Sequence, residues 1–264
     1  MKATIIGHQG WADFFSCNGL YNHYSAIYDE LTIFTLDEAR RKMMEAVFLD
    51  RSNIKIEVPK FIHTSPGETC LICHTYGGKS CPRAGGQCKY IDYSQYSGHK
   101  HIKLGGFDNY DKWDNHVKNN SSFAHAFYTH AVIDATKRIN NFRITRNNIN
   151  EVYNLSNLRS QIGEDYIVTH NDDIRGYSFS LDSKGLPIYN LNLKSDILID
   201  QLAIIENAKE LHFIDSSYSV LIYLMTFHSP KIAQIPKFLH ASCRPSNRDV
   251  GIYKNPTPPN WYVV

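Results

Sequence analysis

The sequence predicts an α/β fold in two lobes, each built around a parallel sheet. Short apolar runs rich in β-branched residues alternate with segments of helical spacing in both halves of the chain. Because such alternation places successive strands side by side and in the same direction, each half is expected to form its own parallel sheet. A Cys/His-rich stretch interrupts the first series, and a polar segment separates the two series.

Length, composition and charge agree with a folded α/β protein. The chain has 264 residues, of which 42% are hydrophobic and 20% charged, values typical of globular proteins. The net charge is +2 and the basic residues are scattered, so nucleic acid is not an expected partner. The first residues, MKATIIGHQGW, show no signal-peptide pattern, and no later run is long enough to span a bilayer. We therefore expect a cytoplasmic protein without a membrane span.

The first half predicts three strands joined by two helices. A strand is expected at residues 3–6, a helix at 11–28, a second strand at 31–35, a helix capped by Asp37 and running to 49, and a third strand at 54–58. A further helix is expected at 121–136. This order predicts a Rossmann-like N-terminal lobe, for which we expect residues 1–155.

Between residues 61 and about 103 the periodic pattern gives way to Gly, Ser, Tyr, His and Cys. We predict an insertion at about 62–104, held by structural zinc, because four cysteines lie within nineteen positions and thiolates bind zinc tetrahedrally. Free buried thiols and disulfides are the alternatives, and reducing conditions inside cells oppose the latter. The predicted ligands are Cys70, Cys73, Cys81 and Cys88.

The second half repeats the alternation and predicts a Rossmann-like C-terminal lobe at residues 156–264. A polar connector at 147–161, with a short helix, leads into it. Strands are expected at 166–169, 187–189, 211–214 and 231–235, with helices at 197–208 and from 217 to 226. The Pro-rich tail from residue 245 should be irregular and could pack Trp261 and Tyr262 against the lobe.

The first polar loop that follows a predicted strand runs from Gly7 to Asp13. In parallel sheets ligands bind beyond the carboxyl ends of the strands, which makes these loops the places to search for a site. Asp13 would open the following helix near its positive end, where its carboxylate could act as a base. Alternatively Asp13 only caps that helix, and His8 is the other candidate base.

Two further polar loops follow strands of the second half. In the loop from His170 to Gly176, Arg175 could bind a diphosphate through paired hydrogen bonds, or could pair instead with one of the neighbouring aspartates. The third loop is Asp215-Ser216-Ser217, at a strand-to-helix junction. Its hydroxyl and N–H groups could bind phosphate or ribose, or could simply cap the helix.

Several segments together resemble one protein family. They include Gly10–Asp13, Cys17–Leu20, Phe142–Asn147 and, as the most specific, Glu206-Asn207-Ala208 followed by His212-Phe213-Ile214-Asp215-Ser216-Ser217. In these segments the chain resembles GT-B-type glycosyltransferases of bacteria and large DNA viruses. The resemblance covers most of the chain outside the Cys/His-rich insertion, and it implies a GT-B-like pair of lobes, in the host cytoplasm if the protein is viral.

The resemblance also implies an activity and a role for each lobe. It implies an inverting, metal-independent transfer of sugar from a nucleotide-diphosphate sugar to a hydroxyl of a glycan or another acceptor. Asp13 of the acceptor-binding lobe would take the hydroxyl proton, and Arg175 would neutralise charge on the departing diphosphate. The implied donor-binding residues are His170, Asp172, Arg175, Gly176, Asp215, Ser216 and Ser217.

Two other functions are compatible with the pattern. A DNA-base glucosyltransferase would share the two lobes, but it should carry a basic cleft for the phosphate backbone, and the near-neutral charge argues against it. A non-catalytic, zinc-containing binding module would use the insertion to recruit a partner.

Overall fold

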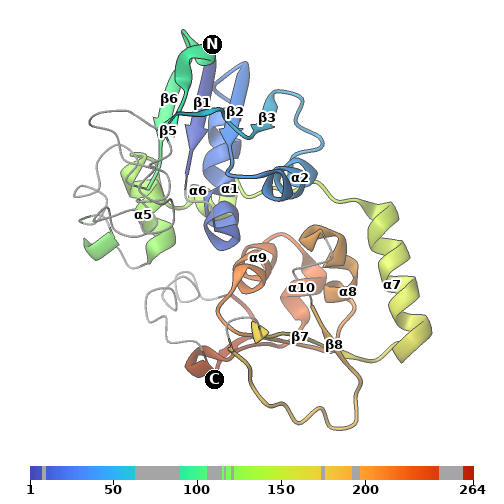
Figure 1. Cartoon of the computed structure of the whole chain (residues 1–264). Helices are drawn as coiled ribbons and strands as arrows, with labels where there is room; N and C mark the ends of the chain where they lie inside the picture. The colour runs from blue at the N-terminus through green and yellow to red at the C-terminus, as the bar shows by residue number, and fades with distance from the viewer. Residues whose placement is uncertain are drawn as a thin grey trace. The chain divides into compact units, whose positions relative to one another are not determined.

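The computed structural model describes residues 1–7, 10–62, 90–105, 115, 117–119, 122–173, 176–191, 197–243 and 258–264. They form two compact units, Met1–Arg143 and Ile144–Val264, each with helices and a parallel sheet, as predicted (Figure 1). The division comes earlier in the chain than the expected boundary at residue 155, which lies inside helix α7 (Asn148–Ile162). No helix in the described ranges is long and apolar enough to cross a membrane.

The sheet of the first unit has four parallel strands in the order β3-β2-β1-β6. They are β1 (Lys2–Ile6), β2 (Glu30–Phe34), β3 (Ile54–Glu57) and β6 (Lys100–Lys103). Helices α1 (Trp11–Ser25) and α2 (Glu38–Val47) connect the first three strands. Asp37 caps α2 as predicted, because its carboxylate accepts a hydrogen bond of 2.8 Å from the N–H of Arg40. This arrangement is compatible with a Rossmann-like sheet.

Strand β6 was not predicted, and the expected insertion at 62–104 is therefore too long at its C-terminal end. Residues 90–104 contain β5 (Tyr90–Ile91), which pairs with β4 (Phe61–Ile62), the 3-10 helix η1 (Tyr93–Tyr96), and β6 itself. Ile91 and Tyr96 pack against Ile6 and Phe34, the last residues of β1 and β2. The sequence of β6, KHIK, lacks the apolar pattern from which strands are predicted. An edge strand needs little apolar side-chain surface, so a polar sequence can occupy this position.

The predicted helix at 121–136 is shorter than expected. Helix α5 (Phe123–His130) begins after its cap Ser122 and ends where Val132 adopts a left-handed backbone with φ of 56°. The short helix α6 (Lys137–Asn140) follows and packs against α1. The chain then enters the second unit through α7, a helix of 15 residues where the sequence predicted a polar connector with a short helix.

The sheet of the second unit has five parallel strands in the order β11-β10-β9-β7-β8. They are β7 (Ile167–His170), β8 (Ile188–Asn190), β9 (Glu210–Phe213), β10 (Lys237–Leu239) and β11 (Trp261–Val263). The predicted helix at 197–208 is present as the 3-10 helix η3 (Leu198–Gln201) and α8 (Leu202–Glu206). Helix α9 (Ser217–Met225) follows β9, and all its residues are buried.

Two predictions for the end of this unit are wrong. A strand was expected at residues 231–235, but residues 231–234 belong to helix α10 (Pro230–Gln234), because Ser229 caps it and Pro230 suits the first helical position. The tail, expected to be irregular, contributes strand β11, which pairs with β10. Trp261 is buried, and the ring of Tyr262 stacks on that of Phe238.

The two faces of this sheet are covered differently. Helices α8, α9 and α10 lie on one face in Figure 1, and the connection from β7 to β8, whose described residues contain no long helix, passes the opposite face. On that opposite face the ring of Phe179, from this connection, lies 6.3 Å from the ring of His212 on β9, measured between centroids. A loop thus covers a sheet face that a helix usually covers in doubly wound folds.

Candidate functional site

Each sheet has one point at which the strand order reverses. In the first unit it lies between β1 and β6, and in the second between β7 and β9. The loops that leave the carboxyl ends of two such strands diverge, and the crevice that results is where open parallel sheets bind ligands. The polar loops that the sequence singled out begin at β1, β7 and β9, so all three leave strands that flank a reversal point.

Asp13 lies in the first turn of α1, three residues after Gly10, which precedes the helix with extended backbone. A Cβ atom added to Gly10 would lie 2.8 Å from Asp13 Oδ2, so the carboxylate folds back over the start of the helix. From this position an acidic side chain stabilises the free N–H groups of the first turn. The residue that caps α1 is Gly10, without a side-chain cap hydrogen bond, so capping by Asp13 and its role as a base both stay predictions. His8 falls outside the described residues.

Two ionisable groups lie in α1 one and two turns after Asp13, and both are buried. Burial raises the pKa of the Cys17 thiol well above its usual value, and the nearby charge of Asp13 raises it further. The pKa of the Tyr21 hydroxyl is raised for the same first reason, burial. Both groups therefore stay protonated near neutral pH, and neither can serve as a base or a nucleophile there.

His170, the last residue of β7, is buried, and its imidazole is held in one orientation. It is 3% exposed, and its ring packs against that of Tyr218 in α9, with 4.7 Å between ring centroids. Its Nδ1 lies 3.2 Å from the carbonyl oxygen of Leu191, and because a carbonyl only accepts, Nδ1 carries the proton. The imidazole is thereby fixed between β8 and α9 at the reversal point.

The loop after His170 closes on itself. Asp172 and Tyr177 exchange both backbone hydrogen bonds, at 2.8 and 3.0 Å, and Gly176 supplies the left-handed turn with φ of 75°. Asp172 is 8% exposed, so it is largely shielded from solvent. Arg175 lies outside the described residues, and both its predicted diphosphate contact and its pairing with an aspartate stay predictions.

The third loop starts α9 with a reciprocal cap. Ser216 Oγ accepts from the N–H of Ser219 at 3.4 Å, and Ser219 Oγ accepts from the N–H of Ser216 at 2.8 Å. The Ser216 hydroxyl therefore serves the helix, as the capping alternative held. Ser217 is the first helical residue, and within the described part of the chain no hydrogen bond involves its hydroxyl. Asp215 precedes them and is 5% exposed.

These two loops of the second unit lie side by side. His170 is the register neighbour of Phe213, and its carbonyl oxygen accepts from the N–H of Ile214 at 3.3 Å. The segment from Asp172 to Gly176 and the segment from Asp215 to Ser217 therefore leave adjacent strand ends. The fold thus places six of the seven predicted donor-binding residues at or just after the carboxyl ends of β7 and β9: His170, Asp172, Gly176, Asp215, Ser216 and Ser217.

The predicted zinc ligands Cys70, Cys73, Cys81 and Cys88 lie outside the described residues. Among the residues that the structure does describe, no group of three or more His, Cys, Asp or Glu side chains is arranged to hold a metal ion. Zinc binding by the four cysteines stays a prediction.

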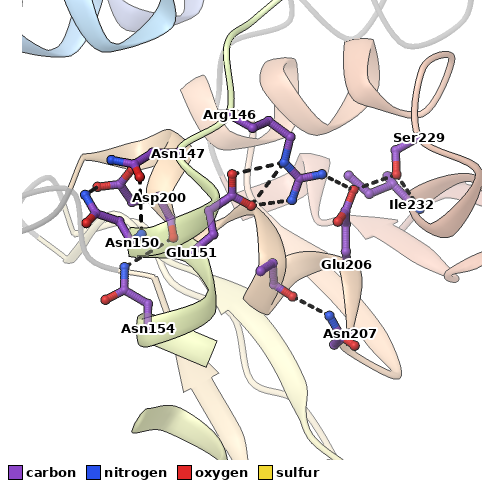
Figure 2. A network of polar contacts seen from close by, with 11 residues as sticks. Arg146, Asn147, Asn150, Glu151, Asn154, Asp200, Glu206, Asn207, Ser229 and Ile232 are labelled. Carbon is purple, nitrogen blue, oxygen red and sulfur yellow. Dashed lines mark hydrogen bonds and ion pairs between the residues drawn. The ribbon is translucent and has the colours of Figure 1, made fainter. Parts of the chain in front are cut away.

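Two of the segments that carry the resemblance meet in a polar network of the second unit (Figure 2). The Arg146 guanidinium binds the carboxylate of Glu151 on α7 and lies 2.7 Å from Glu206 Oε1 on α8. Ser229, the cap of α10, donates to the same Glu206 oxygen at 2.7 Å. Arg146 and Glu206 therefore hold three helices together, which is a structural role.

Two groups at the carboxyl ends of the second sheet's strands were not predicted. Ser219 completes the cap of α9, and the spacing of two serines three residues apart could have indicated it. His240 follows β10 and bonds to His212 on β9. No local pattern joins two histidines 28 residues apart, so only the pairing of β9 with β10 brings them together.

Comparison of the chain with models of protein families and with curated proteins finds no match in either case.

Proposed function

We propose that this chain is a GT-B-like glycosyltransferase that moves a sugar from a nucleotide-diphosphate sugar to a hydroxyl of a glycan or another acceptor. The second unit would bind the donor and the first unit the acceptor. The observation that carries the proposal is the placement of the two polar loops of the second unit at neighbouring strand ends, where the strand order reverses. Nucleotides bind at such points in doubly wound sheets.

The side chains at these strand ends are of two kinds, and each kind suits a different part of the donor. The carboxylates of Asp172 and Asp215 would repel a diphosphate but accept hydrogen bonds from hydroxyl groups, which suits ribose or the sugar. The N-terminus of α9 and the Ser217 hydroxyl suit a phosphate, since both offer hydrogen-bond donors. Arg175 would supply the positive charge that the diphosphate needs.

In the proposed reaction the acceptor oxygen attacks the anomeric carbon of the sugar as the bond from that carbon to the diphosphate oxygen breaks. The configuration at the carbon inverts. Asp13 takes the hydroxyl proton, and Arg175 stabilises the negative charge on the leaving diphosphate. No metal takes part in this reaction, and zinc, if the four cysteines bind it, would only stabilise the segment that contains them.

Donor binding is the first test. Thermal shifts of the full chain would be measured with UDP-glucose, GDP-mannose and the free diphosphates UDP and GDP. We expect at least one of the nucleotide sugars to raise the melting temperature, and we expect Ser217→Ala to weaken its binding roughly 2- to 10-fold through loss of one hydrogen bond. Ser156→Ala, on the exposed side of α7, is the matched control. Absence of any shift would favour the non-catalytic binding module.

The base is tested with Asp13→Asn, which keeps the shape of the side chain at the start of α1. We expect turnover to fall roughly 100-fold or more, as for the loss of a general base, with donor affinity unchanged. Undiminished turnover would show that Asp13 only caps the helix.

A further inference from the structure

Three ionisable side chains form a hydrogen-bonded chain on the loop-covered face of the second sheet. Glu210 Oε2 lies 3.1 Å from His212 Nε2, and His212 Nδ1 lies 3.1 Å from His240 Nε2. Glu210 and His212 share a face of β9 because they are two residues apart, and His240 follows the neighbouring strand β10. The proposed function uses none of the three.

The Glu210 carboxylate, at one end of this series of hydrogen bonds, determines which atom donates and which accepts in each bond. A carboxylate only accepts hydrogen bonds, so His212 Nε2 carries a proton and donates it to Glu210. Neutral His212 then has a lone pair on Nδ1, which accepts from Nε2–H of His240. Neutral His240 is left with a lone pair on Nδ1, and in the described part of the structure no group bonds to that atom.

The surroundings keep both imidazoles neutral. Burial, followed by the neighbouring His212, lowers the pKa of His240 to about 4, and burial lowers that of His212 although Glu210 opposes the change. Lys184, in the connection from β7 to β8, also lowers the pKa of His212. The ring of Phe179 stacks on His240 with 3.8 Å between centroids and 2° between planes. The His240 ring therefore has a fixed plane and no charge near pH 7.

His240 lies at the same sheet edge as the candidate donor site. Its N–H donates to the carbonyl oxygen of Phe213 at 2.8 Å, and Phe213 is also the register neighbour of His170. Phe179, which stacks on His240, belongs to the connection whose first residues are the polar loop from His170 to Gly176. The His240 backbone thus lies at the strand ends that would receive the donor, and its ring lies against the connection that carries the polar loop.

We infer that His240 Nδ1 accepts a hydrogen bond from a hydroxyl group of the ribose or sugar of a bound nucleotide sugar. His212 and Glu210 are positioning residues that hold the imidazole in the form with a lone pair on Nδ1. The inference rests on the proposed donor site. Phosphate is excluded as the partner of this nitrogen, because phosphate oxygens are acceptors and cannot donate to a lone pair.

The binding test compares the unaltered chain with His240→Phe, which keeps an aromatic ring against Phe179 but has no lone pair. We expect the variant to bind the nucleotide sugar that gave the largest shift roughly 2- to 10-fold more weakly, as for loss of one hydrogen bond. His125→Phe, a half-buried histidine of the first unit, is the matched control and should bind normally. Unfolding curves of both variants check that they are folded.

The spectroscopic test reads the ring nitrogens directly by NMR of the chain labelled with ¹⁵N-histidine. We expect His240 Nδ1 to be unprotonated in the free protein and its signal to move when the nucleotide sugar binds, a change that a merely structural histidine would not show. Glu210→Ala should mix the two neutral forms of both histidines, and Glu210→Gln should restore one form because its amide oxygen accepts from His212 Nε2–H.

The outcomes separate the inference from the proposed function. If nucleotide sugars bind and His240→Phe binds them equally well, or if Nδ1 carries the proton in the free protein, the inference is wrong and the proposed function stands. If the unaltered chain binds no nucleotide sugar, both are overturned.

Discussion

At the scale of single residues, the close approach of neighbouring residues requires a glycine at position 19. A Cβ atom at this position would lie 2.3 Å from the carbonyl oxygen of Lys137 and 2.7 Å from the hydroxyl of Tyr128. Asn18 beside it is fully buried, and its Oδ1 accepts from the N–H of Arg143 at 2.8 Å. The Cys-Asn-Gly segment thus serves the packing of α1 against α6 and the exit of the chain from the first unit.

We expect Gly19→Ala to destabilise the chain by about 1–3 kcal/mol, the usual cost of forcing extra volume into packed structure. Without this contact the change would stabilise α1, because alanine favours helices over glycine by up to about 1 kcal/mol. Urea unfolding of the variant and of Thr129→Ala, an exposed position of α5, would measure the difference. A Gly19→Ala chain as stable as the original would contradict the close contact.

Lys237 is a second residue whose surroundings determine its chemistry. It is fully buried in β10, and its ammonium group donates to the carbonyl oxygens of Ile232 and Ile235, both at 2.6 Å. These carbonyls lie at the end of α10, where a positive charge is favoured. Burial nevertheless lowers the pKa of Lys237 to about 8.

The lowered pKa predicts a pH dependence of stability. Between pH 8 and about 10 the folded chain loses the Lys237 proton while the unfolded chain keeps it, so Lys237 makes a contribution to the free energy of unfolding that rises with pH, whereas the raised pKa of Cys17 makes one that falls. Above that range Tyr24 and Tyr166, whose pKa values are raised to about 12, act in the opposite direction. In urea unfolding from pH 7.5 to 10, the slope of the free energy of unfolding against pH should be less positive for Lys237→Met than for the unaltered chain, and equal slopes would refute the assignment.

At the scale of elements, helix α7 is held by polar contacts and leaves apolar side chains in solvent. Ile149, Val152 and Tyr153 are 64–83% exposed, whereas Glu151 is 1% exposed. Asn150 Nδ2 donates to Asp200 Oδ2 at 2.9 Å, and the guanidinium of Arg146 binds Glu151. Charged and amide side chains thus attach α7 to η3 and α8, which explains how a polar, Asn-rich segment becomes a full helix.

Removal of the arginine at the centre of this network should be costly. Arg146→Met would leave Glu151 and Glu206 buried without their cation, and we expect a loss of about 3 kcal/mol, the lower end for a broken buried pair because Arg146 is 30% exposed. Arg41→Met is the matched control, since Arg41 also bridges two glutamates, but on the surface of α2. Equal losses in urea unfolding would show that burial of the network contributes nothing.

At the scale of the whole molecule, an arginine on each side of the boundary between the units forms ion pairs within its own unit. Arg143 belongs to the first unit, where its guanidinium lies 2.7 Å from Asp50 Oδ2. Arg146 belongs to the second unit through Glu151 and Glu206. The boundary therefore falls between two arginines three residues apart.

This boundary predicts which fragments fold. We expect the fragment 144–264 to unfold cooperatively at a higher temperature than the fragment 156–264, because the shorter one lacks Arg146, Glu151 and half of α7. Circular dichroism during heating would compare the two. A shorter fragment that is equally stable would place the boundary at residue 155 after all.

Much of the fold could be predicted because its signals are local. Apolar or alternating runs of four or five residues located β1, β2, β3, β7 and β9 to within one or two residues, and Asp37 marked the start of α2. The errors concern elements whose sequences say little about burial. Strand β6 is polar, β11 follows a Pro-rich stretch, and α10 has only five residues.

Local sequence therefore specified the alternation of strands and helices and the polar loops after β1, β7 and β9, because hydrophobic period and turn chemistry act within a few residues. The strand order, the edge strands and the meeting of His212 with His240 depended on the folded chain, because pairing between distant strands leaves no local mark. For the same reason the placement of the loops after β7 and β9 at one reversal point, on which the proposed function rests, emerged from the sheet.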